Sequence, residues 1–134
     1  MDKLISLQDA VNKVKDGMTI MVGGFLTNGG PNAIMDALAV SGVKDLTLIC
    51  NDAAYPDRGL GQLIANRKVK KVITSYIGSN PVAIDQMNAG ELVVEFSPQG
   101  TLAERIRAYG AGLGGVLTPT GQGTVVHDGK TTIT

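Results

Sequence analysis

The sequence lacks the residue types from which disulfide frameworks and metal centres are built. Its 134 residues include no tryptophan, one cysteine (Cys50) and one histidine (His127). A single cysteine excludes an intramolecular disulfide. A zinc site needs three or four nitrogen, sulfur or oxygen ligands, and no cluster of such residues supplies them. We therefore expect no bound metal.

The chain also lacks an excess of either charge and any long hydrophobic run. Lys and Arg number 12, Asp and Glu number 12, and the formal net charge is 0. This balance excludes the basic surface expected of a nucleic-acid binder or of a polybasic membrane module. No stretch approaches the ~18 apolar residues that span a bilayer, and the N-terminus lacks the apolar core of a signal peptide. We predict a cytoplasmic protein with no nucleic-acid partner and no membrane partner.

Glycine, by contrast, is abundant, with 18 residues. The glycines follow no three-residue period, which excludes a collagen-like chain. The segments between them are apolar, which argues against disorder. The length fits one domain, and we expect residues 1–134 to form it.

Short apolar runs alternate along the chain with segments of helical periodicity. We predict helices at residues 7–14, 31–40, 59–66, 81–88 and 101–109, and strands at residues 18–22, 46–50, 71–76 and 92–96. Ser6 with Asp9 resembles a capping box before the first helix. Alternating strands and helices indicate βαβ units. The predicted fold class is α/β, an open, mostly parallel sheet with helices on both faces.

The end of the chain carries the pattern of a hairpin. Residues 124–126 and 131–133 are rich in β-branched side chains and flank a turn signal at Asp128 and Gly129. We predict two paired strands here. Because the second would run to the last residue, we expect the domain to be truncated at its C-terminus.

Candidate site residues follow the predicted strands, because ligands of open α/β sheets lie beyond the carboxyl ends of the strands. A glycine-rich loop at residues 23–31 precedes a helix, and its free N–H groups suit a phosphate, carboxylate or thioester oxygen. A tight turn with no ligand is an equally good interpretation. Asn51 and Asp52 follow the next strand and fit an Asx-turn. The Gln99 amide can donate to a developing oxyanion, whereas Thr101 fits a helix N-cap.

Other chemical motifs fail on inspection. Residues 124–131 end like a phosphate-binding loop, but Thr124 stands where the first glycine is required. We interpret His127 as a turn residue and Cys50 as a small buried apolar residue. The chain thus offers hydrogen-bond donors and a glycine loop but no activated nucleophile.

Residues 16–31 resemble the signature of family I coenzyme A transferases. That signature runs Asp/Asn-Gly, two free positions, three apolar residues, Gly-Gly-Phe, three free positions and Gly-x-Pro, and every fixed position is met. Residues 97–102 and 117–121 also look like this family. The resemblance covers the whole chain and is closest to the α subunit of short-chain acyl enzymes, such as the acetoacetate, acetate/butyrate and 3-oxoacid transferases.

The resemblance implies an enzyme that moves coenzyme A (CoA) from an acyl-CoA to a free carboxylic acid. The family's nucleophile is a glutamate in a Ser-Glu-Asn-Gly type motif of the β subunit, and this sequence contains no such motif. We therefore expect a chain that is inactive without its β subunit, an α2β2 hetero-oligomer, and a CoA thioester as substrate with no tightly bound cofactor. Residues 1–134 would be the N-terminal part of a single α-subunit domain.

Residue by residue, the resemblance implies three groups of site residues. The CoA-binding loop would be Gly23, Gly24, Phe25, Leu26, Thr27, Asn28 and Gly29. Gln99 would contribute to the oxyanion pocket without acting as nucleophile, and Asn51 and Gly100 would contact the substrate. One departure is Tyr109, which stands where the family usually has glycine.

Two alternatives use the same glycine loop. One is a non-catalytic regulatory domain of related α/β fold that binds an anion or sugar phosphate. The other is a sugar-phosphate isomerase, which needs an acid/base residue that we cannot nominate. A neighbouring gene encoding Ser-Glu-Asn-Gly would favour the transferase.

Overall fold

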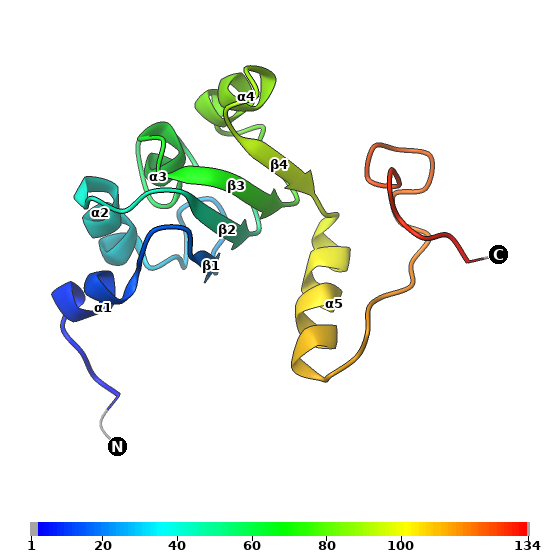
Figure 1. The fold of residues 1–134 in the computed structure, drawn as a ribbon, viewed down its shortest axis with the longest axis horizontal. Helices are drawn as coiled ribbons and strands as arrows, with labels where there is room; N and C mark the ends of the chain where they lie inside the picture. Colours follow the sequence, from blue (N-terminus) through cyan, green and yellow to red (C-terminus); the bar gives the residue numbers. More distant parts are fainter. Residues whose placement is uncertain (1–2, 134) are drawn as a thin grey trace.

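The computed structural model describes residues 3–133 and contains one four-stranded parallel sheet in the order β1-β2-β3-β4 (Figure 1). The strands are β1 (Thr19–Val22), β2 (Leu46–Cys50), β3 (Val69–Thr74) and β4 (Val93–Phe96). The helices are α1 (Leu7–Lys13), α2 (Asn32–Val40), α3 (Gly61–Ala65), α4 (Pro81–Asn88) and α5 (Gln99–Gly110). The predicted α/β class and parallel sheet are confirmed.

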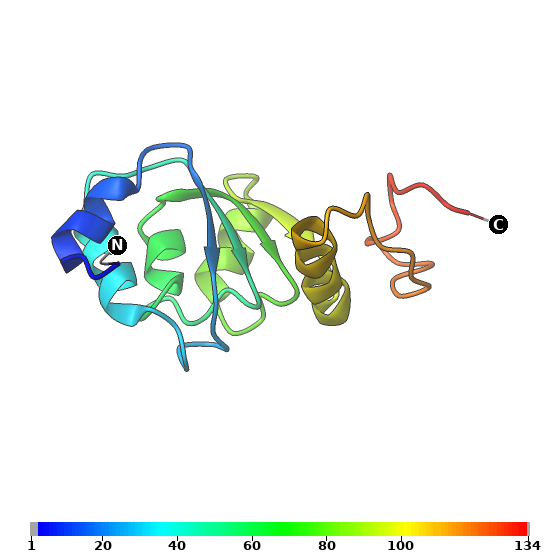
Figure 2. The same ribbon diagram turned by 90° about the horizontal axis from the view of Figure 1, so that it is seen from below.

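Helices lie on both faces of this sheet, but unequally. Figure 2 shows α2, α3 and α4 on one side of the strands and α5 on the other. The three crossover connections lie on one face for two reasons. Each new strand is added at the same edge of the sheet, and crossovers between parallel strands are right-handed. Burial alternates along β2 because only one face of the sheet is covered by these helices. Leu46, Leu48 and Cys50 are buried, whereas Thr47 and Ile49 are half-buried.

The hydrophobic core fills the space between the sheet and α2–α4. Its largest fully buried apolar side chains are Leu38, Leu46, Leu48, Leu63, Ile64, Val72 and Leu92. Each fully buried leucine of this kind stabilises the fold by roughly 1.5–3 kcal/mol. This packed layer supports the carboxyl ends of the strands, where the candidate residues lie.

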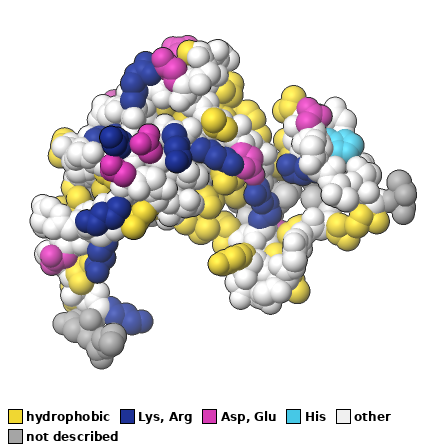
Figure 3. Space-filling view, viewed as in Figure 1, with side chains coloured by type: hydrophobic (Ala, Val, Ile, Leu, Met, Phe, Trp, Pro, Cys, Tyr) yellow, Lys and Arg dark blue, Asp and Glu magenta, His cyan; other side chains and the backbone are white. Residues whose placement is uncertain are grey.

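The opposite face of the sheet is sparsely covered. Met21 and Val93 remain 56% and 59% exposed. A chain of ion pairs crosses this face, from Lys71 on β3 to Glu95 on β4 (2.8 Å) and from Glu95 to Arg105 on α5 (3.0 Å). Figure 3 shows alternating basic and acidic side chains running toward α5, with hydrophobic side chains where the sheet faces that helix.

Most of the predicted helices and strands form, but only one of the two predicted helix caps does. The Ser6 Oγ accepts from the Asp9 N–H at 3.1 Å, as a cap should. The prediction that Thr101 is an N-cap is wrong. Helix α5 begins at Gln99, and the Pro98 carbonyl accepts from the Leu102 N–H at 2.8 Å, so Thr101 lies inside the first turn and not before it.

The predicted hairpin at residues 124–126 and 131–133 is also wrong. The N–H of His127 donates to the Thr124 carbonyl, and the N–H of Lys130 donates to the His127 carbonyl, so successive turns replace a ladder. Gly121, Gly123 and Gly129 adopt positive φ, which favours turns over extended backbone. No residue from 111 to 133 is in a helix or strand. Thr134 lies outside the described residues.

Within residues 3–133, none of the helices combines the length and apolar character needed to cross a membrane.

Candidate functional site

A hollow of about 550 Å³ lies where the carboxyl ends of β1 and β2 face α5. Five of the predicted site residues line it: Gly23, Gly24, Phe25, Asn51 and Gln99. Ile49, Leu102 and Ile106 add apolar surface to the same hollow. Residues far apart in the sequence therefore meet at this edge of the sheet, as expected for a parallel α/β fold.

The first loop (residues 23–30) turns sharply after β1. The Phe25 and Asn28 backbones exchange two hydrogen bonds of 3.0 and 2.9 Å around Leu26 and Thr27. Gly24 has a φ of +128°, and a Cβ there would lie 3.1 Å from the Asn28 carbonyl oxygen and from Gly30 backbone atoms. A side chain at Gly24 would therefore strain the loop.

The predicted loop residues do not all face the hollow. Leu26, Thr27, Asn28 and Gly29 complete the turn and are not among its lining residues. Gly29 has a φ of +71°, which favours glycine for conformational reasons alone.

The second loop (residues 53–60) repeats this geometry after β2. Tyr55 and Arg58 form an antiparallel bridge like that of Phe25 and Asn28, and Gly59 follows with a φ of +57°. The loops lie close together, since a Cβ built on Gly59 would lie 3.4 Å from Thr27 Cγ2. Sequence reasoning missed this pairing. The sequence does contain a signal for it, because each loop has an aromatic residue four positions before a glycine, Phe25 before Gly29 and Tyr55 before Gly59.

The buried Asp52 carboxylate joins the two loops. Its Oδ2 accepts from the Leu26 N–H at 2.9 Å and from Asn51 Nδ2 at 3.0 Å. Its Oδ1 accepts from the Ala54 N–H at 2.8 Å. The contact with Ala54 confirms the Asx-turn predicted at Asp52, whereas the side chain of Asn51, predicted to do the same, donates to Asp52. The bond to Leu26, in a segment 26 residues away, has no counterpart in the sequence-based prediction.

Asn51 is held from two sides. Its side-chain amide donates to Asp52, and its carbonyl accepts from both the Oγ and the N–H of Ser75, at 2.6 and 3.1 Å. The side chain is half-buried and lines the hollow. Asn51 thus has a fixed place between β2 and the hollow.

Gln99 and Gly100 are adjacent in sequence but line different hollows. Gln99 is exposed, begins α5 and faces the 550 Å³ hollow. Gly100 lines a second hollow of about 430 Å³ with Thr101 and residues 116–118. The structure therefore brings Gln99, but not Gly100, together with the first loop and Asn51.

The titratable groups nearest this edge do not form an acid/base pair. Burial raises the pKa of Cys50 to about 12. A hydrogen bond with Thr74 lowers this pKa in part, and the nearby Asp52 charge raises it further. The thiol therefore stays protonated at neutral pH, as expected for a buried apolar residue. Lys71 first, and then Arg105, hold the pKa of Glu95 below its ordinary range.

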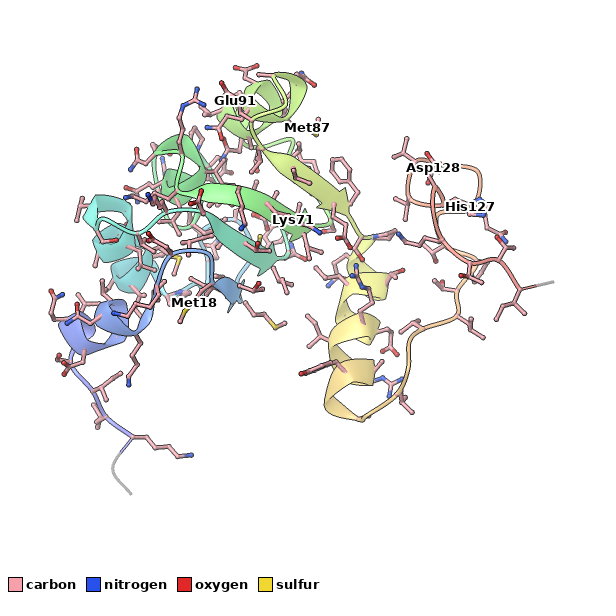
Figure 4. All side chains as sticks on the ribbon, viewed as in Figure 1. Met18, Lys71, Met87, Glu91, His127 and Asp128 are labelled. Carbon is pink, nitrogen blue, oxygen red and sulfur yellow. The ribbon has the colours of Figure 1, made fainter. Side chains whose placement is uncertain are left out.

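The other candidate groups lie elsewhere. His127 and Asp128 belong to the terminal segment, on the far side of α5 from the sheet (Figure 4). Within residues 3–133, no three His, Cys, Asp or Glu side chains are grouped to hold a metal ion.

These features define an α/β domain whose described residues offer a glycine loop and amide donors to a ligand. The chain belongs to the coenzyme A transferase family, since the family model described as "Coenzyme A transferase" matches residues 4–134.

Individual relatives agree with this assignment. Over 98% of its length the chain is 58% identical to the acetate CoA-transferase subunit alpha of Escherichia coli, covering 60% of that protein. Over 96% of its length it is 55% identical to the acetoacetyl-CoA:acetate/butyrate CoA transferase alpha subunit of Clostridium acetobutylicum, covering 59%. The chain therefore spans about three-fifths of each of these two relatives.

A solved structure agrees as well. The glutaconate coenzyme A-transferase of Acidaminococcus fermentans superposes with a TM-score of 0.77 at 30% identity, over 95% of this chain and 41% of that one. Nothing in these comparisons favours the regulatory alternative.

Proposed function

We propose that the chain is the N-terminal part of the α subunit of a two-subunit CoA-transferase. The enzyme would move CoA between a short-chain acyl-CoA and a free carboxylic acid. The observation that carries this proposal is the meeting of the first loop, Asn51 and Gln99 at one hollow. The named α subunits among its relatives support it.

In this proposal the chain binds and polarises the thioester while a partner supplies the nucleophile. A glutamate carboxylate of a β subunit attacks the thioester carbon, and the CoA thiolate leaves to give an acyl anhydride. The thiolate then attacks the enzyme's own carbonyl of the anhydride. This step releases the first carboxylate and forms an enzyme–CoA thioester, which the acceptor acid cleaves by the reverse sequence.

Gln99 would act on the charge that develops in the first step. As the carbonyl becomes tetrahedral its oxygen gains negative charge, and the Gln99 amide would donate to it from the first turn of α5. A neutral amide serves here because a carboxylate would repel that charge. Asn51 would orient the acyl carboxylate or carbonyl from the opposite side of the hollow.

The first loop would bind the CoA portion. Without a Cβ at Gly23 and Gly24, a ligand can approach the backbone closely. CoA would be a substrate and no tightly bound cofactor is proposed. Gly100, which lines the other hollow, would contact substrate only through movement of α5. We also propose an α2β2 assembly in the cytoplasm.

Coexpression tests this function. The full-length α subunit and a candidate β subunit carrying Ser-Glu-Asn-Gly are purified together and assayed with a panel of acyl-CoA donors and carboxylate acceptors. We expect acyl exchange from the complex and none from the α subunit alone. A borohydride-trappable thioester on a glutamate of this chain would overturn the proposal.

A further inference from the structure

The Asp52 carboxylate has more hydrogen bonds than a turn requires. An Asx-turn needs only the bond from the Ala54 N–H. The second oxygen accepts from Leu26 in the first loop and from the Asn51 side chain. Asp52 is 2% exposed. The bond from Ala54 is buried and the bonds from Leu26 and Asn51 are half-buried, so water competes little for the carboxylate.

Both backbone donors belong to residues in an unfavourable conformation. Leu26 has a φ of +55° and Ala54 a φ of +51°, the left-handed region that residues with a Cβ rarely adopt. One residue lies in each loop. Asp52 therefore binds each loop at its non-glycine residue of positive φ, a conformation that costs free energy unless neighbouring groups hold it.

A carboxylate suits this place better than any other side chain. It only accepts hydrogen bonds, and its two oxygens can take several donors at once. An asparagine of the same shape would replace one carboxylate oxygen with an NH₂ group, which would face N–H donors and could not accept their hydrogen bonds. Bonds to a charged acceptor are also stronger than those to a neutral one.

We propose that Asp52 is a positioning residue of the acyl-CoA site, which acts by fixing the first loop through Leu26 and the substrate-facing amide through Asn51. The inference rests on the proposed function. Asp52 itself does not line the hollow, so it acts on substrate only through these two neighbours.

Two variants of Asp52 test this in the full α subunit assembled with its β subunit. Asp52→Ser keeps an oxygen that can accept from Ala54 but is too short to reach Leu26, so it removes the bond between the loops and spares the turn. Asp52→Asn keeps the shape and puts a donor against Leu26 or Asn51. We expect each to raise KM for acyl-CoA by about tenfold, with a smaller change in kcat, because an unpaired donor displaces the loop.

Asn80→Ser is the matched control. Asn80 is fully buried, donates to the Ala53 carbonyl at 2.9 Å and caps α4 through the Ala83 N–H, and these side-chain hydrogen bonds go to neither the first loop nor Asn51. Serine retains the cap and loses the bond to Ala53. We expect a lowered Tm with KM unchanged.

Hydrogen exchange of the Leu26 amide supplies a readout that does not depend on activity. Both Asp52 variants should accelerate it, and Asn80→Ser should not. If the wild-type complex transfers CoA and Asp52→Ser retains the wild-type KM, the inference is overturned while the proposed function stands. If the wild-type complex transfers CoA from none of the acyl-CoA substrates, the proposed function is wrong, and so is this role of Asp52.

Discussion

The two sides of the hollow are built differently. The loop side consists of the first loop and Asn51, fixed by the buried Asp52 and by the Ser75 bonds. The helix side consists of α5, and among residues 3–133 its hydrogen bond to the sheet is the one from Arg105 to Glu95. Ile106 on this side is 41% exposed. A rigid side suits binding, because it holds its groups in place before substrate arrives, whereas the few contacts of α5 with the sheet leave that helix more mobile.

This difference predicts different kinetic consequences for the two sides. Substitutions on the loop side should act mainly on KM, because a displaced loop weakens the binding of the substrate and of the transition state equally. Damage to the helix side should act mainly on kcat if Gln99 contacts only the developing charge. The following substitutions test this division in the assembled enzyme.

Gly24→Val should have the largest effect. A branched side chain would collide with the Asn28 carbonyl and Gly30 at 3.1 Å, and the φ of +128° is unfavourable for valine. We expect the affinity for CoA to fall by at least about 100-fold, while the core elsewhere keeps the complex folded. Titration calorimetry with CoA measures this.

Gly115→Val is the control for that variant. A Cβ on Gly115 would meet nothing within 4 Å and its φ is not positive, so valine there should leave binding unchanged. Unchanged CoA affinity in Gly24→Val would mean that the first loop is only a turn.

Gln99→Ala should have an effect of comparable size, on the helix side. Removal of one oxyanion donor lowers turnover by about 100- to 1000-fold, or roughly 3–4 kcal/mol. We expect kcat to fall with little change in KM or Tm. Gln99→Glu should be at least as damaging because its carboxylate repels the developing charge.

Thr101→Ala, two residues further along α5, is the control for Gln99. Thr101 lines the second hollow and should tolerate the change in the kinetic assay. A folded Gln99→Ala complex with wild-type kcat would remove Gln99 from the mechanism.

Glu95→Gln tests how α5 is attached and should have a modest effect. Lys71 first, and then Arg105, lower the pKa of Glu95 from its ordinary 4.5. The ionised form therefore stabilises the fold above pH 4.5, and this contribution is lost as the pH falls through the lowered value. The Tm of the variant should lie slightly below wild type at about pH 7, and the difference should close in acid.

Glu104→Gln separates this effect from a general loss of charge. Glu104 pairs with Arg107, which lies on α5 itself and not on the sheet. Its Tm difference from wild type should be smaller at neutral pH. Equal differences for the two variants would show that the bond to Glu95 does not anchor the helix.

The sequence predicts the loop side better than the helix side, for physical reasons. Buried strands such as residues 46–50 and the turn after β1 are encoded locally, by apolar runs and by glycines. The contact between Asp52 and Leu26 joins residues 26 positions apart and leaves no local pattern. The predicted start of α5 is two residues late because a threonine cap is a stronger local signal than a proline whose carbonyl closes the turn.

The hairpin prediction fails for a related reason. The β-branched pattern at residues 124–133 satisfies local rules, but a two-stranded hairpin needs a surface to pack against. Residues 122–125 and 127–133 are exposed, so no such surface covers them. The positive φ of Gly121, Gly123 and Gly129 then favours successive turns.

Gly23→Ala should have the smallest effect and gives the finest test of the loop side. Gly23 lines the hollow, yet nothing lies within 4 Å of its potential Cβ and its φ is not positive, so the fold itself does not require glycine there. A methyl group should leave Tm unchanged and raise KM for acyl-CoA within about fivefold, because only a ligand approaching the backbone would meet it. Gly42→Ala, equally free of neighbours but remote from the hollow, should change neither quantity. If Gly23→Ala lowers Tm while KM stays constant, glycine at this position serves folding, and the ligand does not approach the backbone at Gly23.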